Sequence, residues 1–133
     1  TSYVWVHHAW MKDFPRTDYY EAMRENVNMW HEASAKYVVP YHPNVSMGWD
    51  SSPRTIQSDV FDSTGYPYTP VIESTPEKFK QALLTSRDFI MSQPNEHRIL
   101  TLNAWNEWTE GSYLEPDTVN GFEYLDAIRD VFA

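Results

Sequence analysis

Hydrophobic residues along the chain first gather into three short, mainly apolar runs. Runs of this length without alternating polar positions are typical of strands that are buried on both faces of a sheet. The predicted strands extend from Tyr3 to His7, from Val45 to Gly48 and from Arg98 to Leu102. The segment from Ser51 to Ser74 contains three prolines and a glycine and is predicted to be a long loop, which in a compact domain is usually functional.

Longer segments between these strands repeat apolar residues at the spacing of an amphipathic helix. The first predicted helix begins after Asp18, an N-cap residue with Glu21 three positions later, and runs to about Lys36. The second begins within Ser74-Thr75-Pro76-Glu77 and ends near Gln93, and the last begins at Asn120-Gly121. The expected apolar faces are Tyr20, Met23, Val27, Trp30 and Ser34, then Phe79, Leu83, Ser86, Phe89 and Ile90, and finally Phe122, Leu125, Ile128 and Phe132.

The alternating order β-α-β-α-β-α is typical of an α/β fold with parallel strands and right-handed crossovers. Three strands alone would leave two apolar edges, which natural proteins cover or close. We therefore predict that residues 1–133 form a single βαβαβα segment, the C-terminal part (about three βα units) of a (β/α)8 TIM-type barrel. The missing N-terminal part of that barrel is an expected partner. Because Thr1 leads almost directly into a strand, the true N-terminus is expected upstream.

Composition and charge narrow the classes of partner. The formal net charge is −9, and so acidic a chain lacks the basic patch that nucleic acids and anionic membranes require. The absence of cysteine excludes disulfides, thiol nucleophiles and thiolate metal sites. No apolar run reaches the roughly 18 residues of a membrane span, so no span is expected in this chain. Composition does not fix the compartment, and we favour an extracytoplasmic (periplasmic or secreted) location.

Candidate chemistry is concentrated from Leu102 to Asp117, directly after the third predicted strand. The carboxyl ends of parallel strands are where active sites of α/β proteins are built. Glu107 and Glu110 are three residues apart, which in a helical turn places both on one face with Cβ atoms about 5–6 Å apart. Retaining glycosidases hold their two carboxyl groups roughly 5–5.5 Å apart, so this spacing suits cleavage of a glycosidic bond. The alternative is a pair of exposed acids at the start of a helix, where the helix dipole favours them.

Aromatic, amide and charged side chains near the strand ends complete a candidate sugar site. Aromatic residues make up 16% of the chain, and many lie in predicted loops, where flat amphipathic rings can contact the apolar faces of sugars. Trp105 is instead expected in the core. The predicted substrate-binding residues are Trp49, Asp50, Arg54, Trp108, Tyr113, Asn106, His7 and Trp10.

Each of these residues also has a purely structural interpretation. Trp49 and Trp108 could be core rings, and Asp50 and Arg54 could form a loop salt bridge, which contributes little when it is exposed. A histidine after a strand, such as His7, is usually just hydrogen-bonded. No spacing of acids and histidines indicates a metal site, and neither a metal nor a cofactor is predicted.

Two motifs resemble those of the glycoside hydrolase family 99-like domains, which include the WbsX-like glycan-processing proteins. Asn106-Glu107-Trp108-Thr109-Glu110-Gly111, followed by Leu114-Glu115-Pro116-Asp117, is similar to the family's Asn-Glu-Trp-x-Glu-Gly core and its Leu/Ile-Glu-Pro segment. Gly48-Trp49-Asp50 with Pro53-Arg54 resembles a second family signature. The resemblance implies a (β/α)8 barrel acting on glycans, in which Glu107 is the base, acting on a sugar 2-hydroxyl, and Glu110 is the acid/base.

The resulting hypothesis is a glycan-active enzyme, most simply a glycoside hydrolase, with an oligosaccharide or polysaccharide substrate. Glu107 is expected to be the base or nucleophile and Glu110 the acid/base. One alternative is a non-catalytic carbohydrate-binding domain with a decayed site. Another is a glycosyltransferase of polysaccharide biosynthesis, although no glycine-rich phosphate loop or basic cluster for a nucleotide-sugar donor is visible.

Overall fold

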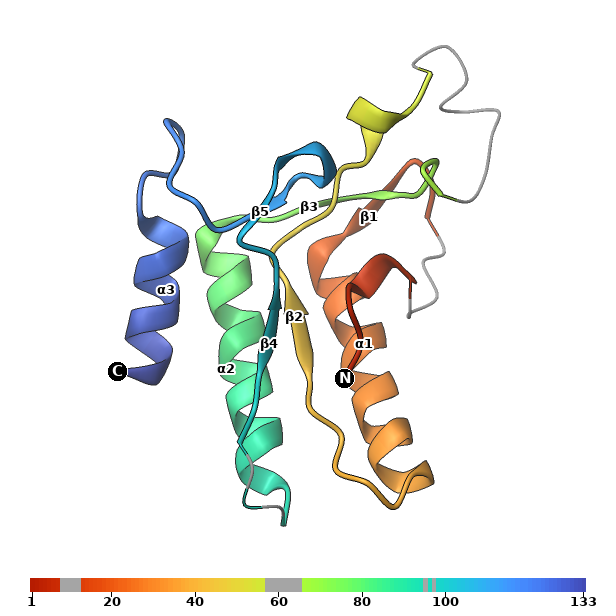
Figure 1. The fold of residues 1–133 in the computed structure, drawn as a ribbon, viewed down its shortest axis with the longest axis vertical. Coiled ribbons are helices and arrows are strands. Elements are labelled where there is room, and N and C mark those ends of the chain that lie inside the picture. Colours follow the sequence, from red (N-terminus) through yellow and green to blue (C-terminus); the bar gives the residue numbers. More distant parts are fainter. Residues whose placement is uncertain (8–12, 57–65, 95, 97) are drawn as a thin grey trace.

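The computed structural model describes residues 1–7, 13–56, 66–94, 96 and 98–133. Three helices form one layer, in which α2 (Pro76–Ser92) lies between α1 (Tyr19–Lys36) and α3 (Glu123–Phe132) (Figure 1). Short strands lie against this layer. The loops that follow the strands gather at the end of the molecule where the helices begin, away from the C-terminal ends of α1 and α2 (Figure 1).

The strands of the described residues form three pairs. Strand β1 (Arg16–Asp18) is parallel to β3 (Val71–Glu73), and β2 (Asn44–Ser46) is parallel to β4 (Thr101–Asn103). Strands β5 (Asn106–Glu107) and β6 (Ser112–Tyr113) form an antiparallel hairpin. The predicted α/β class is therefore confirmed as a mixed α/β fold with small sheets, whereas the TIM-type barrel stays a prediction.

The helix starts follow the capping signals in the sequence. The Asp18 carboxylate accepts hydrogen bonds from the backbone N–H groups of Tyr20 (2.9 Å) and Glu21 (3.3 Å) at the start of α1. The Thr75 hydroxyl accepts one from Lys78 N–H (3.3 Å) at the start of α2. These bonds satisfy backbone donors that have no partner inside the helix. The predicted starts of α1 and α2 are confirmed, and α3 begins two residues after Gly121.

The predicted apolar face is confirmed for α2 and in part for α1 and α3, where Trp30 is buried and Met23, Val27, Leu125 and Ile128 pack against the core. Helix α1 buries Tyr19 rather than Tyr20, because the Tyr19 hydroxyl donates a hydrogen bond (2.8 Å) to the carbonyl of Ser46 in β2. In α3 the predicted Phe122 and Phe132 are exposed. The residues buried by the three helices are Tyr19, Ala22, Asn26 and Trp30, then Phe79, Ala82, Leu83, Ser86 and Phe89, and finally Ala127 and Val131.

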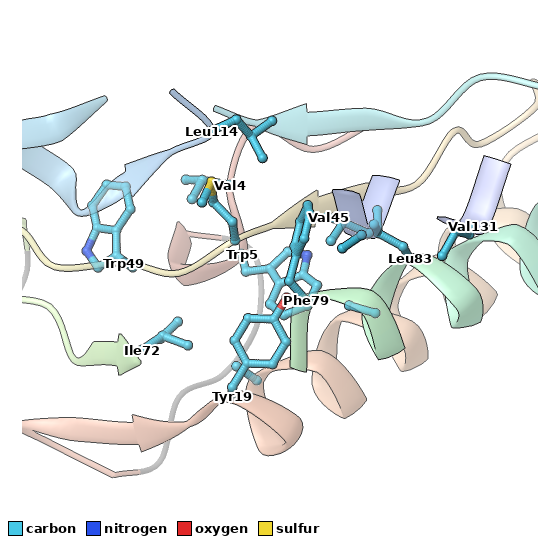
Figure 2. Close-up of a cluster of buried hydrophobic side chains, with 14 of the residues drawn as sticks. Val4, Trp5, Tyr19, Val45, Trp49, Ile72, Phe79, Leu83, Leu114 and Val131 are labelled. Carbon is cyan, nitrogen blue, oxygen red and sulfur yellow. The ribbon is translucent and has the colours of Figure 1, made fainter. Parts of the chain in front are cut away.

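The predicted strand from Tyr3 to His7 is wrong. Residues Trp5–His7 form a short 3-10 helix instead. The Trp5 backbone N–H donates to the Ser46 hydroxyl (3.1 Å), and its indole N–H donates to the Asn44 carbonyl (2.8 Å). This segment is thus attached to β2 through side chains and not through a ladder of backbone hydrogen bonds. Trp5 lies among the buried side chains that link β2 to the helices (Figure 2).

Strands β1 and β3 were not predicted, and β3 lies inside the segment predicted as a loop. Each is three residues long, too short to show the alternating pattern of a strand. The other two predicted strands are confirmed with shifted bounds, as β2 and β4. An isolated bridge between Trp49 and Ile72 connects the end of β2 to β3.

Candidate functional site

Glu107 and Glu110 lie on a tight hairpin. Glu107 ends β5, and residues Trp108–Glu110 form one 3-10 turn before β6, so the expected helical turn is a 3-10 turn. The hairpin continues through Gly111, which has the left-handed φ of 58° that favours glycine. A Cβ atom at Gly111 would lie 2.9 Å from the Cβ of Asp50, so the close approach of the two segments also requires a glycine.

Arg54 makes ion pairs with both acids. Its Nη1 lies 2.7 Å from Glu110 Oε1, and its Nη2 lies 3.6 Å from Glu107 Oε2. Arg54 follows β2, in the 3-10 turn Ser52–Arg54, so two predicted motifs that are more than fifty residues apart meet at one guanidinium. The carboxylates of Glu107 and Glu110 are thereby held next to one positive charge.

The Arg54 guanidinium is itself fixed by hydroxyl groups. The Thr109 hydroxyl accepts hydrogen bonds from Arg54 Nε (3.1 Å) and Nη2 (2.7 Å), and the Tyr66 hydroxyl accepts one from Nη1. The Tyr66 contact, followed by the negative charges of Glu110 and Glu107, raises the pKa of Arg54 above its ordinary value. Arg54 is therefore a permanent positive charge of the site.

The two acids differ in burial. Glu110 is only 6% exposed, and its Oε2 atom is buried with no hydrogen-bond partner among the described residues. The Glu107 side chain is 38% exposed. A buried acceptor without a partner is rare in native proteins and is often found at functional positions. Oε2 of Glu110 thus lacks the hydrogen bond that a buried carboxylate oxygen normally accepts.

Asp50 joins the hairpin to the end of β2. Its backbone N–H donates to the Glu110 carbonyl (2.6 Å), and its carboxylate accepts from Ser52 N–H (2.9 Å). The first bond fixes the backbone of the buried acid, and the second shapes the turn that carries Arg54. Asp50 therefore holds the two halves of the site together.

An aromatic pair, exposed Trp108 and half-buried Tyr113, flanks the acids. The rings of Trp108 and Tyr113 are stacked, with centroids 3.7 Å apart and an interplanar angle of 16°. The Trp108 indole N–H donates to Glu115 (2.6 Å), which fixes the plane of the ring, and Trp108 remains 47% exposed. The prediction that Trp105 lies in the core is wrong, because this residue is 54% exposed. The indole of Trp108 in the hairpin and that of Trp105 just before it are thus exposed to solvent.

The other predicted site residues lie farther into the protein or at its edge. Trp49 is 1% exposed, and its indole N–H donates to the Thr69 hydroxyl (2.6 Å). The exposed His7 ring meets Trp49 edge-on, with centroids 5.4 Å apart, and also contacts Tyr66. Asn106 is exposed and pairs with Tyr113 in the hairpin. Trp10 lies outside the described residues.

Three neighbours of the acids were not identified from the sequence. Thr109 is the variable position of its motif, and Tyr66 lies in the predicted loop, so nothing in the sequence indicated that either residue belongs to the site. Tyr3 was assigned to a strand, yet it is 57% exposed. Burial of part of its hydroxyl, and then the negative charges of Glu110 and Glu107, raise the pKa of Tyr3. The Tyr3 hydroxyl therefore lies within the electrostatic reach of both acids.

The described part of the chain contains neither a cluster of metal-binding side chains nor a helix that could span a membrane. No group of three or more acids and histidines lies close enough together there to bind a metal ion. None of the helices found there is sufficiently long and apolar to cross a bilayer.

Comparisons with known proteins indicate a family whose role is related to glycans. A family model described as "Glycosyltransferase WbsX" matches residues 4–128. The uncharacterized protein WxcX of two strains of Xanthomonas campestris pv. campestris is 36% identical over 89 residues, which are 66% of this chain and 12% of each relative. The chain thus corresponds to a small part of these curated relatives. No solved structure matches it.

Proposed function

Because the chain belongs to the WbsX glycosyltransferase family, whose role is related to glycans, we propose that it carries the acid pair of an enzyme that hydrolyses a glycosidic bond. Glu107 acts as base or nucleophile, and Glu110 acts as acid/base. The observation that carries the proposal is the contact of Arg54 with both carboxylates, 2.7 Å from Glu110 and 3.6 Å from Glu107.

The burial of the two acids supports this division of roles. Arg54 contacts Oε1 of Glu110, and the proposal assigns proton transfer toward the leaving oxygen of the sugar to Oε2, which is buried and has no hydrogen-bond partner among the described residues. Proton transfer from a positioned side chain contributes roughly 10²–10⁴-fold to rate. Glu107 is more exposed and can approach a sugar hydroxyl or the anomeric carbon. The open face of Trp108 is available to the apolar face of a sugar ring.

We also propose that the chain supplies the C-terminal part of a (β/α)8 barrel whose remaining strands come from the rest of the protein. Each parallel sheet of the described residues has two strands, so both of its outer edges lack a partner there. The site lies at the carboxyl end of β2 and just after β4, where barrel enzymes build their active sites. An extracytoplasmic location accords with a polysaccharide substrate and stays part of the proposal.

The test of the proposed function replaces each acid singly in the complete protein. Glu107→Gln and Glu110→Gln keep side-chain volume but remove the charge and the proton chemistry. Each is expected to lower turnover on a panel of oligosaccharides by about 10²–10⁴-fold. Glu77→Gln, at an exposed position in the first turn of α2, is the matched control and should keep full turnover. Unchanged turnover in both site variants would refute the assignment.

The description of the family favours glycosyl transfer as a second candidate function. The same acid pair can pass a sugar to a hydroxyl of another glycan in place of water. Assaying one glycan with and without an added acceptor separates the two outcomes, because hydrolysis releases new reducing ends and transfer lengthens the acceptor. A non-catalytic binding domain would show neither product and would bind the glycan equally well after Glu107→Gln.

A further inference from the structure

A cavity lies next to the acid pair and shares part of its wall. The cavity has a volume of about 250 Å³ and lies between the ends of β2 and β3, strand β6 and the start of α3. Asp50, Gly111 and Tyr113 line it, whereas Arg54 and the two acids do not. It is therefore a separate space that borders the site at Asp50 and the hairpin.

The volume of the cavity suits one ring. Pockets for drug-sized ligands measure roughly 300–1,000 Å³. An apolar cavity of about 150 Å³ holds benzene. A cavity of 250 Å³ can therefore hold a six-membered ring with hydroxyl substituents, but not a nucleotide-sugar.

The lining of the cavity combines apolar surface with polar groups. Val71, Tyr113 and Tyr124 are half-buried and supply apolar surface that a ligand can reach, whereas Trp49 and Ile72 are almost fully covered, at 1% and 2% exposed. Ser74 and Asn120 add a hydroxyl and an amide, and Tyr124 also adds its phenol group. Apolar surface next to a few hydrogen-bonding groups matches a sugar ring, which has apolar faces and polar edges.

The charge of the lining selects against anions. Asp50 and Glu73 contribute carboxylates, and the described residues that line the cavity include no lysine, arginine or histidine. Glu73 also pairs with Arg16, which lies outside the lining. A phosphate or carboxylate ligand would meet the Asp50 carboxylate with no cation in the described lining to bind it, an arrangement that lowers affinity. Sugar hydroxyls, in contrast, donate hydrogen bonds to carboxylates.

We propose that this cavity binds one uncharged, hexose-type ring of the glycan, as a subsite beside Glu107 and Glu110. The proposal rests on the proposed function of the adjacent acid pair. Tyr113 links the two places, because it lines the cavity and its ring stacks on Trp108. A glycan chain held in the cavity can thus continue across the hairpin toward the acids.

The experiment uses Trp49, a residue of the cavity lining, as a reporter in the complete protein. The NMR signal of the Trp49 indole N–H, assigned with Trp49→Phe, is followed during titration with methyl glycosides of glucose, galactose, mannose and rhamnose, and separately with uridine diphosphate. At least one glycoside should shift the signal in a saturable way, and uridine diphosphate should not. A signal that no glycoside shifts, or that the diphosphate shifts, would overturn the proposal.

A matched pair of variants locates the binding. Val71 lines the cavity, so Val71→Phe fills part of it and should weaken glycoside binding by about tenfold or more. Val119→Phe makes the same change at a position that is 87% exposed and outside the lining, and should leave affinity unchanged. Equal affinity in the folded Val71→Phe protein and in Val119→Phe would contradict the subsite.

A smaller substitution, Tyr124→Phe, tests the subsite if Val71→Phe does not fold. Tyr124→Phe keeps the ring that packs against Phe79, with centroids 5.6 Å apart, and removes only the hydroxyl. Loss of one hydrogen bond should weaken glycoside binding by about two- to tenfold. Unchanged affinity in this variant, with Val71→Phe unfolded, would also count against the proposal.

The subsite and the catalytic assignment fail in different ways. If no glycoside shifts the Trp49 signal but Glu107→Gln and Glu110→Gln lose turnover, the subsite is refuted and the catalytic assignment is kept. A saturable shift at Trp49 with full turnover in both acid variants would remove the proposed function alone, and would leave a sugar-binding cavity.

Discussion

Helix α2 and the hairpin that carries the acids are stabilised in opposite ways. In α2 the stabilising side chains are apolar and hidden, and Phe79 and Leu83 are 0% exposed. In the hairpin the hidden groups are polar, since the buried Ser112 hydroxyl donates to the carbonyl (2.9 Å) and side chain (2.6 Å) of Asn103. The indoles of the hairpin face solvent instead.

This difference separates residues that maintain the fold from residues that are available for chemistry. Apolar burial is the dominant stabilising term of a domain, so α2 is where substitutions should affect stability most. A segment that buries polar groups and exposes rings gains less from burial but offers hydrogen bonds and flat surfaces to a ligand. Substitutions in the hairpin should therefore affect activity more than stability.

The largest effect is expected for Phe79→Ala in α2. Truncation of a fully buried phenylalanine costs about 3–5 kcal/mol, a large fraction of the roughly 5–15 kcal/mol of a typical domain. Urea denaturation should show a much lower midpoint. Trp108→Ala in the hairpin, where the ring is 47% exposed, should lower stability by less than about 1 kcal/mol. Unfolding of both variants at the same urea concentration would contradict the different roles of α2 and the hairpin in stability.

Gly111→Ala should affect both properties. The left-handed conformation costs an L-residue about 1–2 kcal/mol, and the added Cβ would also push on Asp50, 2.9 Å away. Displacement of the hairpin should then lower turnover by about 10²-fold. Gly121→Ala is the control, because Gly121 has a similar φ of 56° but no atom within 4 Å of the added Cβ. Equal turnover losses in the two variants would show that strain alone, and not contact with Asp50, explains the effect.

Arg54→Gln should lower turnover by about ten- to a hundredfold and should also lower the unfolding temperature, because the buried Glu110 carboxylate loses its ion-pair partner. The variant keeps a polar side chain but removes the cation that holds both acids. Arg129→Gln is a control that removes an exposed cation paired with Asp126 and Asp130 on α3, and it should keep turnover. Kinetics and thermal unfolding of both variants check this expectation. Full activity in Arg54→Gln would mean that the ion pairs are only structural.

The smallest effect is the pH dependence of stability that arises from Asp117. Hydrogen bonds from the backbone and side chain of Asn120 and the backbone of Val119 lower the pKa of Asp117 in the folded protein. Its stabilising contribution is therefore present above the unfolded pKa of about 3.9 and is lost as pH falls through the folded value. The stability difference between the protein and Asp117→Ala should be constant near neutral pH and shrink in acid. A difference that grows in acid would contradict this sign.

Local signals in the sequence predicted much of the helical layer. Asp18 and Thr75 mark helix starts because a side-chain oxygen must satisfy the first backbone N–H groups, and this requirement does not depend on distant residues. The choice between Tyr19 and Tyr20 does depend on them. Both have the right spacing, and the hydrogen bond to Ser46 on β2 decides which ring is buried.

The site was predictable only in part, for a similar reason. The motifs contain Arg54, Glu107 and Glu110, but their meeting follows from the packing of the β2 turn against the hairpin. Trp49 and Trp105 both follow strands, and nothing local indicates that the first is covered and the second is open. Tyr66 and Thr109 carry no signal of their own. The roles of all predicted site residues stay predictions.

The most direct test of the central claim is the turnover of the double variant Glu107→Gln/Glu110→Gln beside each single variant. Catalytic groups that work as a unit give strongly non-additive losses. The double variant should therefore be about as slow as the slower single variant. Losses that multiply, or single variants that keep full turnover, would contradict a shared site at Arg54.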